Sequence, residues 1–122
     1  TDVVAKAGEE VLSPVDGVIT RVDVDPYGDG RFKGIEIVSN DGKVVRIHYS
    51  AAHGNLKAGD SVAAGASIGT AQDRAAGSKG MTNHIHVEVW QRKDGQPAAP
   101  KVYGKADLKK DFVARDPWLA FQ

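Results

Sequence analysis

Residues 84–90 read His84-Ile85-His86-Val87-Glu88-Val89-Trp90, and polar and apolar side chains alternate along them. A period of two is that of a β-strand, in which successive side chains point to opposite faces of the sheet. Ile85, Val87 and Val89 therefore face one side, and the two histidines, the glutamate and the tryptophan face the other. The stretch predicts a strand with one apolar and one polar face.

Short segments rich in Val and Ile recur along the rest of the chain, separated by turn residues. The clearest pair is Ile35–Val38 and Val44–Tyr49, which flank the turn sequence Ser39–Gly42. Asp-Gly between two β-branched runs is a strong hairpin signal, because Gly tolerates the positive φ that such turns need. Only Lys105–Val113, with two apolar residues four apart, fits a short helix. We predict an all-β fold, a two-sheet sandwich or flattened barrel of antiparallel strands, with at most one short helix near the C-terminus.

One six-residue pattern occurs twice. Lys6–Val11 is echoed by Lys57–Val62, and each copy leads into a turn and another short strand. The echo suggests a duplicated hairpin unit, although two turns built with the same Gly-acidic chemistry would explain it equally.

Composition excludes several classes of protein. The chain has 122 residues, 16 Lys plus Arg, 16 Asp plus Glu and no Cys. The length fits one domain, and the balanced charge argues against a nucleic-acid partner. No apolar run approaches the roughly 18 residues that a membrane span needs. Without cysteine, any zinc site must use His and Asp ligands.

The polar face of the predicted strand carries two of the four histidines of the chain. Histidine is the commonest side-chain metal ligand and the natural general base near neutral pH. An isolated His-x-His lacks a third ligand, so decoration of a half-exposed sheet explains it as well as a metal site does. The small-residue loop Ala76–Asn83, which leads into the pair, favours the rim of a pocket.

Four segments in order resemble the lysostaphin/LytM-type zinc endopeptidases, which cleave peptides of bacterial peptidoglycan. Residues 1–18 resemble the opening pattern G-x-D-φ-x-A-x-x-G-T-P-V-x-A-x-x-D-G-x-V, where φ is apolar. Residues 56–69 resemble V-x-x-G-D-x-V-x-x-G-Q-x-I-G. Asn83–Val89 is similar to P-H-L-H-F-E-φ, and Asp116–Leu119 to D-P-x-x-Y-L.

The resemblance implies a duplicated-hybrid-motif β fold with Zn²⁺ at the floor of a groove. Carried over by position, Asp2 and His86 are metal ligands, His84 is a catalytic base and His48 is a second catalytic histidine. The family's first ligand, the His of H-x-x-x-D, would be the fourth residue before Asp2. We therefore expect residues 1–122 to be one peptidase-like domain without its N-terminal metal-ligand segment.

The second catalytic histidine can be aligned in two ways. His48 takes the position if the following loop is two residues longer, whereas a gapless count back from Gly59 puts Ser50 there. Positions 48 and 50 would share a strand face, so His48 could reach the groove in either case. We expect His53 to lie in a loop, where it could serve as a substitute ligand.

The resemblance thus implies a zinc-dependent endopeptidase that cuts stem or cross-bridge peptides of peptidoglycan outside the cytoplasm. We expect an extracellular or periplasmic monomer whose partners are peptidoglycan peptides, with no nucleic acid and no membrane span. The alternative is a catalytically degenerate member of the same fold that binds a protein or glycan. A biotin or lipoyl carrier is disfavoured, because Gly104–Asp107 lacks the flanking residues of a modified lysine.

Overall fold

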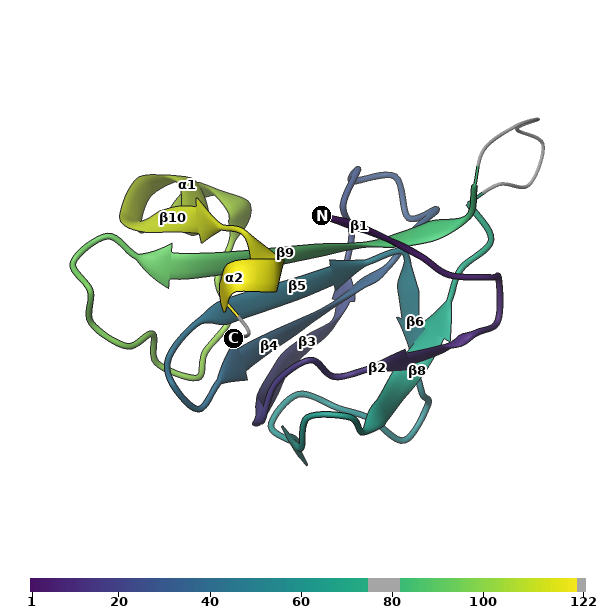
Figure 1. Ribbon diagram of the computed structural model, residues 1–122, viewed down its shortest axis with the longest axis horizontal. Coiled ribbons are helices and arrows are strands. Elements are labelled where there is room, and N and C mark those ends of the chain that lie inside the picture. Colours follow the sequence, from purple (N-terminus) through teal and green to yellow (C-terminus); the bar gives the residue numbers. More distant parts are fainter. Residues whose placement is uncertain (75–81, 121–122) are drawn as a thin grey trace.

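The computed structural model describes residues 1–74 and 82–120, which form two antiparallel sheets (Figure 1). The larger sheet has the order β1-β9-β5-β4-β3-β7, and β10 also pairs with β9. Its strands are β1 (Asp2–Val4), β3 (Gly17–Val24), β4 (Gly34–Ser39), β5 (Val44–His48), β7 (Ser61–Val62), β9 (His84–Arg92) and β10 (Phe112–Arg115). The smaller sheet has the order β2-β8-β6 and consists of β2 (Glu10–Leu12), β6 (Ser50–Ala52) and β8 (Ser67–Ala71).

The predicted all-β fold is confirmed, as is the short helix, which is α1 (Lys105–Asp111). A second helix, α2 (Pro117–Ala120), was not predicted. Most of the expected loop Ala76–Asn83 lies outside the described residues. No helix in the described ranges is long and apolar enough to cross a membrane.

The predicted hairpin joins β4 to β5. Gly42 has a φ of 85°, and its N–H donates to the carbonyl oxygen of Ser39. The repeated six-residue pattern is likewise a repeated turn. Gly8 and Gly59 have φ values of 82° and 99°, and short strands β2 and β7 follow them. The echo therefore marks one turn geometry used once in each sheet.

The main core lies between the two sheets. One face of the larger sheet packs its apolar residues against the smaller sheet, and the buried members of this core include Ile19, Ile37, Val45, Ile47, Val87, Val89, Val11 and Ile68. Val87 and Val89 belong to the apolar set that the period of β9 assigned to this side. The face assignment made from the sequence is confirmed.

The opposite face of the larger sheet is divided in two. At one end Val38, Val44 and Trp90 are covered by the C-terminal segment that includes α1, through the buried residues Ala98, Tyr103, Leu108 and Phe112. In Figure 1 this segment lies at the end of β9 remote from the smaller sheet. The rest of the face is left to polar side chains, and there the histidines lie.

A row of alternating charges crosses the boundary between the two parts of this face. Pairing places Glu88 opposite Arg46, Arg46 opposite Glu36 and Glu36 opposite Arg21. Opposite charges on directly paired residues stabilise neighbouring strands. Glu36 is completely buried, and its carboxylate accepts bonds from Arg46 Nε (3.0 Å), Thr20 Oγ1 (2.8 Å) and the N–H of Tyr103 (3.2 Å). Arg46 also donates to the carbonyl oxygen of Tyr103, so the pair ties the C-terminal segment to the sheet.

We predict that Arg46→Met lowers the free energy of unfolding by about 3–5 kcal/mol, because it leaves the charge of Glu36 buried without its cation. Adding Glu36→Gln should recover part of this loss, since the amide keeps hydrogen bonds without the charge. The measurement is urea unfolding followed by circular dichroism. Arg31→Met is the control, because Arg31 pairs with Asp29 at an exposed position and its loss should change the stability little. Equal effects of the two Arg→Met substitutions would contradict the prediction.

Candidate functional site

The pairing of β1, β9 and β5 builds one row of polar side chains. Asp2 is opposite His86, and His86 is opposite His48. Directly paired residues share a face of the sheet. His86 Nδ1 donates to Asp2 Oδ1 at 2.9 Å, and the rings of His86 and His48 are stacked with centroids 5.8 Å apart. His84 Nε2 is also 3.7 Å from Asp2 Oδ2, so all four residues that the sequence indicated come together.

Gly34 on β4 continues this row and makes space for His48. A Cβ added to Gly34 would be 3.0 Å from His48 Nδ1 and 3.2 Å from Val24 Cβ. His48 is buried, and its Nδ1 has no hydrogen-bond partner within the described ranges. The imidazole therefore occupies space that a side chain at position 34 would fill.

Glu88 links the two stacked imidazoles. Its Oε2 atom is 3.1 Å from His86 Nε2 and 3.5 Å from His48 Nε2, and its Oε1 accepts a bond from Trp90 Nε1 at 3.1 Å. His48 beside it, with help from Trp90 and His86, lowers the pKa of Glu88 to about 2 in spite of partial burial. The sequence placed Glu88 on the correct face but gave it no role.

His84 lies in a cluster that the sequence did not indicate. Its Nδ1 donates to the carbonyl oxygen of Thr82 (3.1 Å), so its Nε2 is left to accept from Arg74 Nη1 (3.1 Å). The guanidinium of Arg74 also lies 3.8 Å from the centre of the Tyr49 ring and donates to the hydroxyl of Tyr27. Arg74 comes from an irregular segment without a recognisable pattern, so the sequence offered no signal for it.

The two tyrosines of this cluster form a wall beside the histidines. Their hydroxyl groups are hydrogen-bonded to each other, and burial, together with that bond, raises the pKa of Tyr49 to about 12. Phe32 packs edge-on against both rings. Tyr49 therefore stays neutral and contributes a hydroxyl group and an aromatic ring.

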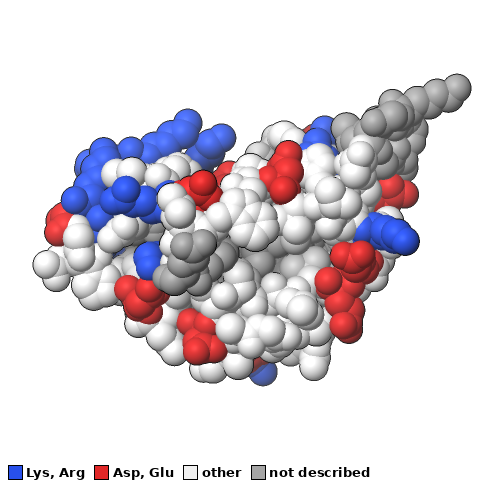
Figure 2. Space-filling view, viewed as in Figure 1, with Lys and Arg blue, Asp and Glu red and all other residues white. Residues whose placement is uncertain are grey.

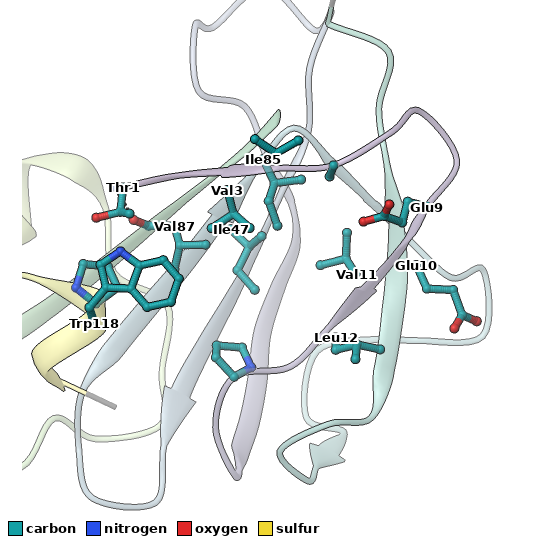
Figure 3. Close-up of a pocket in the computed structure, with 14 residues that line it drawn as sticks. Thr1, Val3, Glu9, Glu10, Val11, Leu12, Ile47, Ile85, Val87 and Trp118 are labelled. Atoms are coloured by element: carbon teal, nitrogen blue, oxygen red, sulfur yellow. Dashed lines mark hydrogen bonds between the residues drawn. The ribbon is translucent and has the colours of Figure 1, made fainter. Parts of the chain in front are cut away.

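The histidine face is hollowed into a groove of about 390 Å³. His48, His86, Glu88 and Trp90 are among its lining residues, together with residues of the loop 25–27 and of α1. A second pocket, of about 280 Å³, lies on the other face of β9 (Figure 3). Its lining is mostly apolar and includes Ile85, Val87 and Trp118, so the polar chemistry belongs to the groove.

His48 and Ser50, the two residues that align with the second catalytic histidine, lie in different surroundings. Tyr49, with a φ of 65°, ends β5 and turns the chain into β6 of the smaller sheet. The expectation that positions 48 and 50 share a strand face is therefore wrong. Ser50 is fully buried, whereas His48 lines the groove. His53 is bonded to Ser67 Oγ and is not a lining residue of the groove.

The sequence pattern of Peptidase family M23 matches residues 1–100 of the chain. The chain belongs to this family. M23 peptidases are peptidoglycan hydrolases, typically zinc-dependent, and act on the cell wall. The resemblance noted in the sequence is thus confirmed at the level of family.

Solved structures show the M23 fold at low sequence identity. The solution structure of lysostaphin is similar with a TM-score of 0.65 and 21% identity, over 98% of this chain and 41% of that one. The catalytic domain of the antimicrobial peptidase lysostaphin from Staphylococcus simulans gives 0.63 and 22%, over 98% and 75%. Csd3 from Helicobacter pylori gives 0.57 and 23%, over 98% and 30%. No curated protein gives a significant match.

The zinc that M23 peptidases typically carry can be tested against the side chains present. Asp2 Oδ1 and His86 Nδ1 are ligand atoms of the right kind, and their separation is 2.9 Å, near the roughly 3.3 Å expected for two ligands of one tetrahedral zinc. Within the described ranges, however, no group of three or more His, Asp or Glu residues is arranged to hold a metal. Asp2 and His86 thus fit as a pair, but they fall short of the three protein ligands of a catalytic zinc site.

We predict that Glu88→Gln destabilises the metal-free protein most above about pH 4.5. The pKa of Glu88 is lowered from 4.5 to about 2, so its carboxylate stabilises the folded state above the unfolded pKa, and this contribution is lost as the pH falls through the folded pKa. The shift corresponds to at most about 3 kcal/mol, and partial exposure reduces this to about 1–2 kcal/mol.

The measurement is urea unfolding in EDTA from pH 6 to pH 2 for both proteins. The difference between them should shrink between about pH 4.5 and pH 2, and a constant difference would contradict the prediction. Glu9→Gln is the matched control, because the side chain of Glu9 is exposed and away from the histidines.

Proposed function

We propose that this domain is a zinc-dependent endopeptidase that cleaves peptide bonds in the stem or cross-bridge of bacterial peptidoglycan. The observation that carries the proposal is the row of Asp2, His86 and His48, whose two histidines line the groove. Membership of family M23 supports the reaction class. The site of action would then be extracellular or periplasmic, and the single domain over residues 1–122 would act as a monomer.

Asp2 and His86 are the proposed zinc ligands from the described part of the chain. The M23-type pattern H-x-x-x-D puts the remaining ligand four residues before Asp2. A zinc bound there would lower the pKa of its water to about 7 and polarise the carbonyl group to be cut.

His84 and His48 are the proposed proton-transfer residues. Both rings lie near the ligand pair, because His84 Nε2 is 3.7 Å from Asp2 Oδ2 and the His48 ring is stacked on His86. Hydrolysis adds water across the C–N bond, so one proton must leave the water and one must reach the departing amine. Arg74, which donates to His84 Nε2, fixes the orientation of that ring before the substrate binds.

A second candidate function is a non-catalytic binding module that uses the same groove. It is favoured by the incomplete ligand set, since Asp2 and His86 are only two of the three protein ligands of a catalytic zinc site. It is also favoured by the two carboxylates that contact His86. His86 Nδ1 faces Asp2 and His86 Nε2 faces Glu88, so both ring nitrogens are already engaged. Metal content and hydrolysis together distinguish the two functions.

We expect the protein, produced with whatever residues its gene encodes before Thr1, to bind about one zinc and to release soluble peptides from purified peptidoglycan. His86→Ala should remove most of the metal and the activity. His53→Ala is the matched control and should keep both, because His53 lies outside the groove. Zinc is measured by inductively coupled plasma mass spectrometry and cleavage by chromatography. A wild-type protein that carries no zinc and cuts nothing would favour the binding module.

His84→Gln and His48→Gln should separate proton transfer from metal binding. We expect each to lower kcat/KM by about 10²- to 10⁴-fold while zinc content stays near that of the wild type. The assay is hydrolysis of a fluorogenic peptidoglycan peptide. Full activity of both variants would exclude the proposed roles.

A further inference from the structure

Basic side chains line the end of the groove that α1 closes. Lys105 and Lys109 of α1 and Arg21 of β3 belong to the lining of the groove at the Trp90 end. Arg21 is 3.7 Å from the exposed carboxylate of Asp23. Lys105 and Lys109 form no ion pair with any residue in the described ranges. These two ammonium groups are therefore available to a ligand.

The periodicity of α1 turns Lys105 and Lys109 towards the groove and its two aspartates elsewhere. Lys105, Leu108 and Lys109 share one face at spacings of three and four residues, and all three line the groove. Asp107 and Asp111 lie on another side of the helix, and Asp107 accepts the N–H of Gly104. Figure 2 shows Lys and Arg side chains gathered over α1 and β10.

The acidic residues of the groove form no ion pair with Lys105 or Lys109, because their oxygens are bonded elsewhere. Asp25 accepts the N–H groups of Gly28 and Gly30 with its two oxygens. Glu88 is shared by His48, His86 and Trp90. Arg46 beneath is paired with the buried Glu36. Lys105 and Lys109 are thus the two cations of this groove that no carboxylate in the described ranges holds in an ion pair.

We propose that the α1 end of the groove binds a carboxylate of the peptide, so that this domain selects acidic peptides over uncharged ones. The substrate class deepens the proposed function and rests on it. Trp90 is four residues along β9 from His86, which in an extended strand is about 13 Å. In an extended peptide whose scissile bond lies over the histidine row, the carboxylate should therefore lie about four residues from that bond.

The test is an NMR titration of the metal-free domain, which reports binding without hydrolysis. The probes are the hexapeptide acetyl-Gly-Gly-Ala-Gly-Gly-Glu-amide, its Gln counterpart, and the Gln peptide with a free C-terminal carboxylate. The indole N–H of Trp90 reports the groove, and that of Trp118, on the apolar pocket, reports the opposite face.

We expect the Glu peptide to bind about 3- to 10-fold more tightly than its Gln counterpart at low salt, and this preference to disappear near 0.5 M NaCl. The Trp90 signal should shift and that of Trp118 should not. Tight binding of the free-acid peptide would show that a terminal carboxylate serves equally well. Equal affinity of all three peptides, or shifts confined to Trp118, would overturn the proposal.

The double variant Lys105→Gln/Lys109→Gln should abolish the preference for Glu. Its matched control is Lys110→Gln/Lys6→Gln, which removes the same charge, also changes α1 and leaves the lining of the groove intact. Circular dichroism checks that both variants are folded. A preference that survives in the first variant, or is lost in both, overturns the proposal. If the wild-type protein prefers the Glu peptide but hydrolyses no peptidoglycan, the result contradicts the proposed endopeptidase activity and leaves the carboxylate site supported, because binding is measured separately.

Discussion

Strand β9 is hydrogen-bonded along both edges, and the fold and the site both depend on that pairing. It holds β1 and β10 on one edge and β5 on the other. Because a strand alternates its side chains, a fixed register decides at once what is buried and what is exposed. The apolar set of β9 packs into the core, and His86, Glu88 and Trp90 of the polar set line the groove. A slip of one residue would bury the histidines and expose the core.

The side chains on this face of the larger sheet form successive rows, and the rows differ in charge and in burial. The row of Asp2, His86 and His48 reaches the groove through its two histidines. The neighbouring row of Glu88, Arg46 and Glu36 runs from the groove into the interior. The third row is apolar and is covered by the C-terminal segment. The row of histidines therefore lies beside the buried ion pair of Arg46 and Glu36, which ties the C-terminal segment to the sheet.

Much of the fold could be predicted because its signals are local. The alternation along residues 84–90, the Asp-Gly turn and the short helical segment each depend on a few neighbouring residues. The convergence of Asp2, His86 and His48 came from resemblance, since no local rule pairs residues 84 positions apart. The cluster of Arg74 with Tyr27 and Tyr49 could not be predicted, because it depends on how irregular segments pack. The position of Ser50 was misjudged, because a positive φ at a tyrosine has no signal in the sequence.

Tyr49 also connects the two sheets. The chain passes from β5 to β6 through Tyr49 alone, whose N–H donates to Lys33 and whose carbonyl accepts from Gln72. His48 is thus the last residue of its strand in one sheet, and only Tyr49 separates it from the first residue of β6 in the other sheet. A shift of one sheet relative to the other would therefore reach His48 through a single residue. The smaller sheet consequently serves as an anchor for a functional side chain as well as a cover for the core.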